Sequence, residues 1–207
     1  MNKEFFPKKP DSKPTILAAI RRHHLPEAPL PSLDQPWIEY PDARAQFVSV
    51  LESVGGRAIL LPNIAAVNSA LASLPTWAEA KKTVSLVDGI SGNTDLSQIN
   101  DPHAIEDIDF AILPGDFAVA ENGAVWIDDS AVKHRAIYFI TQHLALVVSA
   151  NNIVSNMHEA YQRVSFDSPR FGAFISGPSK TADIEQSLVI GAHGPRSMTV
   201  FVVGQAS

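Results

Sequence analysis

Apolar residues along the chain follow two repeats, one typical of helices and the other typical of strands. Helical spacing predicts helices at residues 42–54, 64–73, 151–163 and 181–190. Short apolar runs rich in β-branched residues predict strands at residues 57–61, 83–87, 117–121, 124–128, 144–149, 171–176 and 199–203. Because helices and strands alternate along the chain, the pattern indicates an α/β fold.

Several of the predicted strands are apolar at almost every position. The clearest are residues 58–61, 144–148 and 200–203. A strand that is apolar on both faces belongs in the middle of a sheet covered by helices on each side. We therefore predict one domain over residues 42–207, built on such a sheet.

The first 41 residues differ from the rest in composition. Closely spaced prolines, from Pro7 to Pro36, prevent regular strand pairing in this part of the chain. Ile16, Leu17 and Ile20 have helical spacing and predict one short helix at residues 15–24. We therefore expect residues 1–41 to form an extended arm with a single helix, packed along the domain or on a neighbouring subunit.

The composition excludes several kinds of site. The 207 residues include no cysteine, so the chain has no disulfide, thiolate zinc ligand or cysteine nucleophile, and cannot by itself hold an iron–sulfur cluster through thiolates. Its histidines lack metal-binding spacing, so no metal site is expected. The formal net charge is −6 without a cluster of Lys and Arg, so neither nucleic acid nor an anionic membrane is expected as a partner.

The sequence also predicts the compartment. The first 14 residues are polar and lack the apolar core of a signal peptide. No stretch reaches the roughly 18 apolar residues that a membrane-spanning helix needs. We therefore predict a cytoplasmic protein without membrane insertion.

The first segment that could carry chemistry is residues 117–127. Asn122-Gly123 between two apolar runs predicts a hairpin with a two-residue type I′ turn, since both central positions need positive φ. Glu121 ends the first run, and two interpretations stay open. It is a solvated residue beside the turn, which the usual exposure of charged residues favours. Alternatively, it is a partly desolvated carboxylate that acts as a nucleophile or general base.

The second such segment, residues 171–196, is predicted to be a strand, a tight loop, a helix and a second loop. Gly177 and Pro178 would end the strand, and Ser179 or Thr181 would cap the helix. A helix N-terminus after a strand can bind an anion. Asp183 and Glu185 in the first helical turn would compete with a phosphate, which favours a hydroxyl-bearing ligand or a protein contact.

Gly191 and Pro195 would end the predicted helix, and His193 and Arg196 would then lie in a loop at the sheet edge. A plain helix-to-strand connection explains this loop as well as a site does. Glu121 and Ser176 each end an apolar strand, so we expect both at one edge of the sheet, where α/β ligands bind. The residues predicted to bind a ligand or partner are Asn122, Gly123, Ser176, Gly177, Pro178, Ser179, Thr181, Asp183, Glu185, His193, Gly194 and Arg196.

Two strings in this segment point to a family. Residues 177–185 read GPSKTADIE and residues 191–195 read GAHGP, and together they resemble the signature of the LUD-domain family. Residues 120–123 are similar to that family's Ala-Glu-Thr-Gly turn, with Asn122 in place of threonine, and residues 143–148 to its His-plus-apolar strand. The resemblance covers about residues 42–204 and leaves the arm unassigned.

The resemblance implies a Rossmann-like α/β sheet of the CoA-transferase and ribose-phosphate-isomerase group. It also implies a role as the non-redox subunit of an iron–sulfur system that oxidises L-lactate to pyruvate. The clusters would lie on two partner subunits, and this chain would bind no cofactor. Whether it performs a chemical step stays open.

Two alternatives remain. The Glu-Asn-Gly string at residues 121–123 also occurs around the catalytic glutamate of class I CoA transferases. This similarity implies an independent enzyme acting through Glu121 on an acyl or phosphorylated substrate. The third possibility is an assembly module without a ligand. A small-molecule ligand is compatible with the complex subunit and with the independent enzyme. A homo-oligomer is compatible with all three hypotheses.

Overall fold

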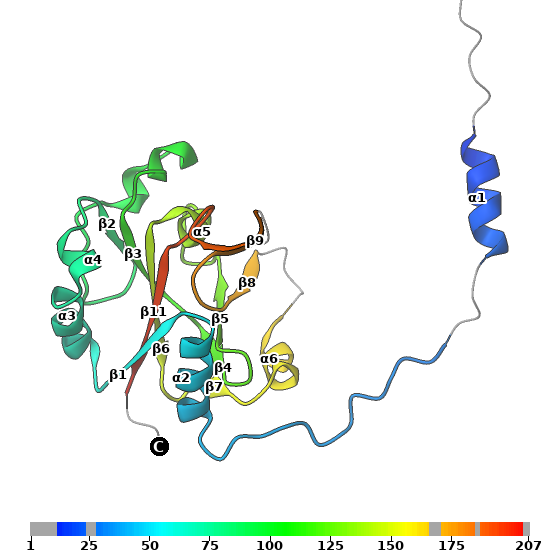
Figure 1. Ribbon diagram of the computed structural model, residues 1–207, viewed down its shortest axis with the longest axis horizontal. Helices are drawn as coiled ribbons and strands as arrows, with labels where there is room; N and C mark the ends of the chain where they lie inside the picture. The colour runs from blue at the N-terminus through cyan, green and yellow to red at the C-terminus, as the bar shows by residue number, and fades with distance from the viewer. Residues whose placement is uncertain (1–11, 24–27, 166–170, 185–186, 205–207) are drawn as a thin grey trace, which may run out of the picture. The chain divides into compact units, whose positions relative to one another are not determined.

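The computed structural model describes residues 12–23, 28–165, 171–184 and 187–204, with only the backbone of residues 182–184, 187 and 188 (Figure 1). The chain divides into two compact units, Met1–Pro36 and Trp37–Ser207. The first unit holds α1 (Lys13–Arg22), which confirms the predicted helix of this region. Ile16, Leu17 and Ile20 are exposed on it.

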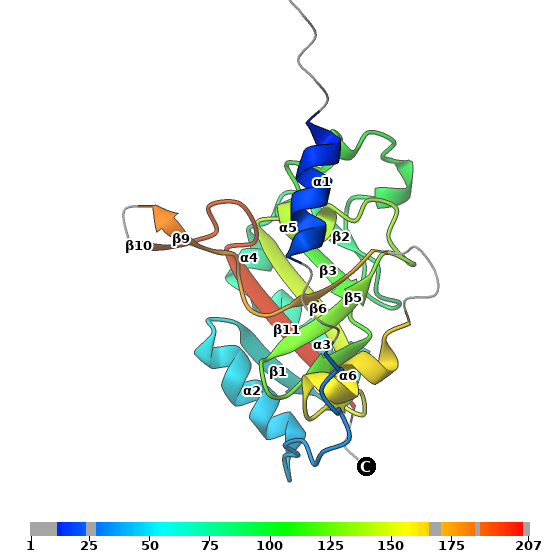
Figure 2. The same ribbon diagram turned by 90° about the vertical axis from the view of Figure 1, so that its right-hand side faces the viewer.

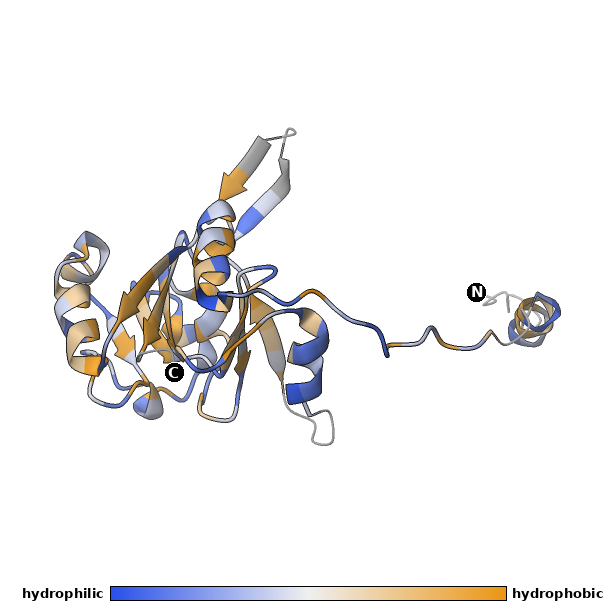
Figure 3. Ribbon diagram, turned by 90° about the horizontal axis from the view of Figure 1, so that it is seen from below, coloured by the Kyte–Doolittle hydropathy of each residue, from blue (hydrophilic) through white to orange (hydrophobic). Residues whose placement is uncertain are grey.

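A parallel sheet forms the centre of the second unit. Its five strands have the order β1-β11-β6-β3-β2, and every neighbouring pair is parallel. This architecture confirms the α/β prediction, and the central strands are apolar along their length (Figure 3). The strands are β1 (Arg57–Leu61), β2 (Thr83–Ser85), β3 (Phe110–Pro114), β6 (His143–Ser149) and β11 (Ser197–Val203).

Both faces of this sheet are covered, but not by helices alone as predicted, because a second sheet covers much of one face. Successive residues of β6 and β11 alternate between two buried clusters: Leu146 and Val200 lie in one, Ala145 and Phe201 in the other. The second cluster includes residues of α3, and α3 and α4 lie on that face in Figure 1. The first cluster includes residues of α2 and of a second sheet. The helices and 3-10 turns of this unit are α2 (Ala43–Ser53), α3 (Ile64–Ala72), α4 (Pro75–Ala78), η1 (Leu96–Gln98), η2 (Pro102–Ile105), α5 (Ile137–Ile140) and α6 (Met157–Arg163).

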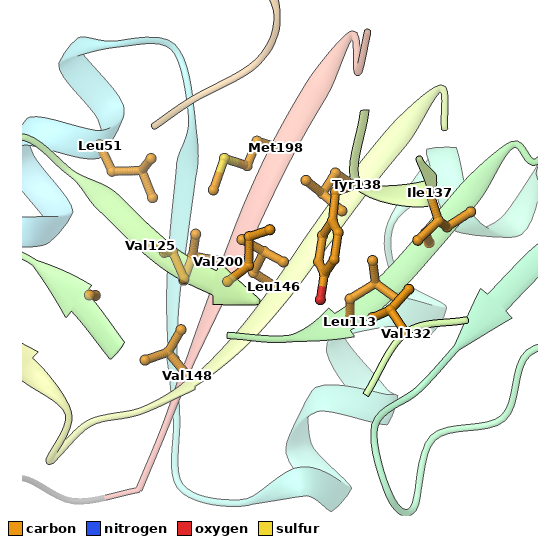
Figure 4. Packing of buried hydrophobic residues seen from close by; sticks show 14 of the residues in the cluster. Leu51, Leu113, Val125, Val132, Ile137, Tyr138, Leu146, Val148, Met198 and Val200 are labelled. Atoms are coloured by element: carbon orange, nitrogen blue, oxygen red, sulfur yellow. The ribbon is translucent and has the colours of Figure 1, made fainter. Parts of the chain in front are cut away.

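The second sheet has four strands in the order β7-β4-β5-β8. Ala118, Val125 and Ile127 of this sheet are buried in the same cluster as the side chains of the first sheet. The core therefore lies between the two sheets, and Figure 4 shows Tyr138 of α5 among its largest side chains. The strands are β4 (Phe117–Val119), β5 (Ala124–Asp128), β7 (Ile153–Val154) and β8 (Gly172–Ile175).

The helix predicted at residues 151–163 is correct only from Met157 onward. Ile153 and Val154 form β7, and the helix begins after Asn156, whose Oδ1 accepts a hydrogen bond from Glu159 N at 3.0 Å. This capping bond explains the late start, because an asparagine side chain competes with helical backbone bonds and favours the N-cap position.

The helix predicted at residues 181–190 is wrong. Residues Lys180–Ile184 form β9 and residues Ser187–Ile190 form β10, an antiparallel pair that makes its own two-stranded sheet. The segment includes Thr181, Ile184, Val189 and Ile190, β-branched residues that lose rotamer freedom in a helix and favour strands. The hairpin projects from the body of the second unit (Figures 2 and 3). The helix N-terminus expected to bind an anion therefore does not exist in this segment.

Within the described part of the chain, no helix combines the length and apolar character needed to span a bilayer.

Candidate functional site

Backbone hydrogen bonds join the loops at residues 176–179 and 191–196 at the base of the hairpin. Ser179 N donates to Pro195 O at 2.9 Å, and Gly191 N donates to Ser179 O at 2.9 Å. Arg196 N donates to Gln142 O at 2.8 Å, which ties the second loop to the residue before β6. Ser179 and Arg196, which the hairpin separates along the chain, are thereby held near the start of β6.

The glycines of these loops are explained by close approaches. A Cβ on Gly191, which has φ +73°, would lie 2.5 Å from Cγ of Arg196. A Cβ on Gly194 would lie 2.9 Å from Cβ of Ser179. Gly191 was expected to end a helix, but it instead lets the stem of Arg196 pass close to the chain.

The start of the signature packs on the end of α2. A Cβ on Gly177, which has φ +73°, would lie 2.7 Å from Val54 O, and Pro178 lies against Gly55. The ammonium group of Lys180 donates to Val54 O. Gly177 and Pro178 therefore fix the base of the hairpin against the α2–β1 loop.

Ser176 joins the turn that follows β4. Its Oγ donates a hydrogen bond to Asn122 O at 2.7 Å, so the structure brings these two predicted residues together. The predicted hairpin of β4 and β5 is confirmed, but the prediction of a two-residue turn between them is wrong. Val119 pairs with Ala124, and residues 120–123 all lie between the strands. Gly123 has φ +65° and approaches the backbone of Leu51.

The carboxylate of Glu121 is directed at α6. Its Oε1 accepts a hydrogen bond from Met157 N at 3.1 Å, at the first residue of that helix. An anionic acceptor at a helix N-terminus is stabilising. Glu121 therefore joins the second sheet to α6, and it lines none of the three cavities described below.

We expect Glu121→Gln to change the free energy of unfolding by less than about 1 kcal/mol, since the amide oxygen still accepts from Met157 N. Glu121→Ala removes the acceptor and is expected to cost about 1–2 kcal/mol. Urea unfolding of both variants measures this difference. Equal effects of the two substitutions would contradict the assigned hydrogen-bonding role.

Three adjoining cavities open where β3, β6 and β11 begin. Their volumes are about 490, 520 and 160 Å³. Gln142 and Arg196 line both the first and the second, while Phe139, His193 and Gly194 line both the second and the third. The ligand crevice was expected beyond the carboxyl ends of strands, whereas these cavities lie at the amino ends of the central sheet. The other lining residues of the first cavity are Thr76, Glu79, Ala80, Asp107, Asp109 and His143.

His143 is a titratable group of the first cavity whose pKa is shifted by this environment. Its Nδ1 lies 2.7 Å from Ser197 Oγ, across the pairing of β6 with β11. Burial lowers the pKa of His143, the positive charge of Arg196 lowers it further, and Asp109 opposes both. The imidazole is therefore neutral near pH 7.

The aspartates of the first cavity already form hydrogen bonds or ion pairs with nearby lysine residues. Asp109 Oδ2 accepts from Lys82 N at 2.9 Å and Lys81 N at 2.8 Å, and these bonds lower its pKa. Asp107 pairs with the ammonium group of Lys82. Among the described residues, no carboxylate forms an ion pair with Arg196.

A metal centre is not found in the described part of the chain, where no three His, Asp or Glu side chains gather in a metal-binding cluster.

The LUD domain family matches residues 92–203, more than half of the chain and almost all of the loops and strands just described. The chain belongs to the LUD-domain family. Residues 177–185 and 191–195, whose strings resemble the signature of that family, lie within the matched range.

Curated relatives of this LUD domain share about a third of its residues over the aligned part. Lactate utilization protein C of Oceanobacillus iheyensis is 30% identical over 104 residues, which is 47% of this chain and 45% of that protein. The protein of the same name from Shouchella clausii is 33% identical over 100 residues, 46% of this chain and 44% of that protein. The alignments thus span just under half the length of these relatives.

A solved structure shares the fold. The crystal structure of a DUF162 family protein from Deinococcus radiodurans superposes with a TM-score of 0.60 at 21% identity. The match covers 78% of this chain and 96% of that one. The LUD domain therefore has an α/β architecture already seen in a crystal.

The predicted binding residues of the LUD domain fall into four groups. Asn122, Gly123 and Ser176 meet at the β4–β5 turn. Ser179, His193, Gly194 and Arg196 line the cavities. Gly177 and Pro178 pack on the α2–β1 loop, and Gly177 also lines the third cavity. Thr181 pairs with Val189 in the hairpin, Asp183 is described by its backbone in β9, and Glu185 lies outside the described residues.

Several cavity residues were not among the predicted ones, notably Asp109, Gln142 and His143. Asp109 directly precedes β3, and His143 is the first residue of β6. A polar residue at the start of a buried apolar strand was the available signal, but the sequence does not reveal that β3, β6 and β11 are neighbours.

Proposed function

We propose that this LUD domain acts in lactate utilisation, as the non-redox subunit of an iron–sulfur system that oxidises L-lactate to pyruvate. The observation that carries the proposal is the match to curated relatives named lactate utilization protein C. The family match includes most residues that line the three cavities, so the cavities lie mainly in the part of the chain that matches the family.

The absence of cysteine supports a division of labour. A chain without thiolates relies on other proteins for iron–sulfur chemistry, so two partner subunits would hold the clusters. The β9–β10 hairpin is the proposed partner surface. It projects from the domain (Figure 2), and neither of its strands pairs with a strand of the two larger sheets in the described structure.

Deleting the gene from its host tests the role in lactate utilisation. We expect the deletion strain to stop growing on L-lactate as sole carbon source and to keep growing on pyruvate, since only the oxidation step is lost. The full-length gene should restore growth, and so should its Glu121→Gln variant. Unchanged growth of the deletion strain on L-lactate would contradict the proposal.

Purification tests the division of labour separately. A tagged chain from lactate-grown cells should retain two iron–sulfur proteins, show their visible absorbance and reduce a dye with L-lactate. The isolated chain should show no visible absorbance and should not reduce the dye with L-lactate. Lactate-dependent dye reduction that scales with the isolated chain would overturn the non-redox assignment.

A further inference from the structure

We propose that the first cavity binds a short carboxylic acid with an oxygen on carbon 2, a 2-hydroxy or 2-oxo acid, whose carboxylate is held by Arg196 and whose carbon-2 oxygen meets His143. The choice of acid rests on the proposed function, whereas the site rests on the residues themselves.

Arg196 supplies the cation that such an acid needs. Its backbone N is fixed on Gln142 O at 2.8 Å, and its stem runs past Gly191, where any side chain would collide with it. Arg196 is exposed and lines the first two cavities, and within the described residues its guanidinium group has no hydrogen bond or ion pair. A planar fork of N–H donors matches a carboxylate with two parallel hydrogen bonds.

His143 supplies the neutral polar partner. Ser197 Oγ occupies Nδ1 at 2.7 Å, which fixes the ring and leaves Nε2 without a hydrogen bond among the described residues. Burial keeps the ring uncharged near neutrality, so its free nitrogen can donate to a keto oxygen or accept from a hydroxyl, according to its tautomer. This contact would distinguish a 2-oxo or 2-hydroxy acid from a plain carboxylic acid.

The acidic residues of the first cavity do not offset its preference for a carboxylate ligand. Asp109 is occupied by the backbone N–H groups of residues 81 and 82, and Asp107 by Lys82. Glu79 also lines the cavity but is exposed, so water screens its charge. With about 490 Å³, the cavity exceeds the needs of a three-carbon acid, so we expect it to accept longer 2-oxo acids too.

Calorimetric titration of the purified full chain tests the site with pyruvate, L-lactate, 2-oxobutyrate, propionate and inorganic phosphate. We expect the first three to bind and propionate to bind roughly 10-fold more weakly, because it has no partner for His143. Arg196→Gln should weaken pyruvate binding roughly 10- to 100-fold. The matched control is Arg57→Gln, an exposed arginine at the start of β1 that lines none of the three cavities and should leave binding unchanged.

His143→Phe keeps an aromatic ring and removes its nitrogens, so it should bring pyruvate binding down to that of propionate and leave propionate unchanged. Absence of binding by the wild-type chain, or equal binding of pyruvate and phosphate, overturns the site. Loss of binding in Arg57→Gln overturns it as well. If the acids fail to bind but deletion of the gene abolishes growth on L-lactate, only the proposed site is wrong. If the acids bind but the deletion causes no growth defect, the proposed function is wrong and the site stands.

Discussion

Tyr138→Ala is expected to lower the free energy of unfolding by about 3–5 kcal/mol, as for other large aromatic residues removed from a core. Tyr138 is 2% exposed and lies between the two sheets with Leu146, Met198 and Val200 (Figure 4). Its hydroxyl donates to Asp128 O at 3.2 Å. Urea unfolding followed by circular dichroism measures the loss.

Tyr138→Phe separates the ring from the hydroxyl. It keeps the packing and removes one hydrogen bond, so we expect a cost of about 1 kcal/mol. If alanine costs no more than phenylalanine at this position, the ring does not contribute to the core as described. The neighbouring Phe139 lines the second and third cavities, so α5 joins the core to these two cavities.

The sheet and most of its strands could be predicted because burial on both faces leaves a direct trace in the sequence. The runs at residues 144–148 and 200–203 are apolar throughout, and they form the inner strands β6 and β11. The strand β3 was missed although Phe110, Ala111, Ile112 and Leu113 are all buried. A short apolar run does not by itself distinguish a buried strand from a buried helix segment, so the pattern at this position did not decide between them.

The hairpin was mistaken for a helix because its polar residues suggested a capped first turn. Ser179, Thr181 and Asp183 fit a helix start, and Gly191 fits a helix end. The β-branched residues between them favour strands instead, and a tight backbone connection between Ser179 and Gly191 closes the hairpin. Local capping signals therefore did not decide the structure of this segment.

The site could be predicted only in part, for a geometric reason. Gly194 and Arg196 belong to one continuous string, which the sequence shows directly. Asp109 and His143 reach the same place through parallel pairing of β3 with β6 and of β6 with β11. Strand order across a parallel sheet depends on crossover connections, so it does not follow from the local pattern of any one strand.

Gly123→Ala is expected to lower the free energy of unfolding by about 2–4 kcal/mol, the sum of backbone strain and overpacking. Gly123 has φ +65°, and a Cβ there would lie 2.8 Å from Leu51 N and 2.9 Å from Leu51 Cα. These are backbone atoms in the last turn of α2, so the neighbour cannot move away by a side-chain rotation.

Gly204→Ala is the matched control, because Gly204 has φ +106° but no atom within 4 Å of an added Cβ. It isolates the strain of positive φ, and we expect a cost of about 1–2 kcal/mol. The excess cost at Gly123 measures the close approach of the β4–β5 turn to α2, the same turn whose Asn122 accepts from Ser176. Equal losses in the two variants, measured by urea unfolding, would show that α2 yields to the added methyl group and that the turn is not held against it.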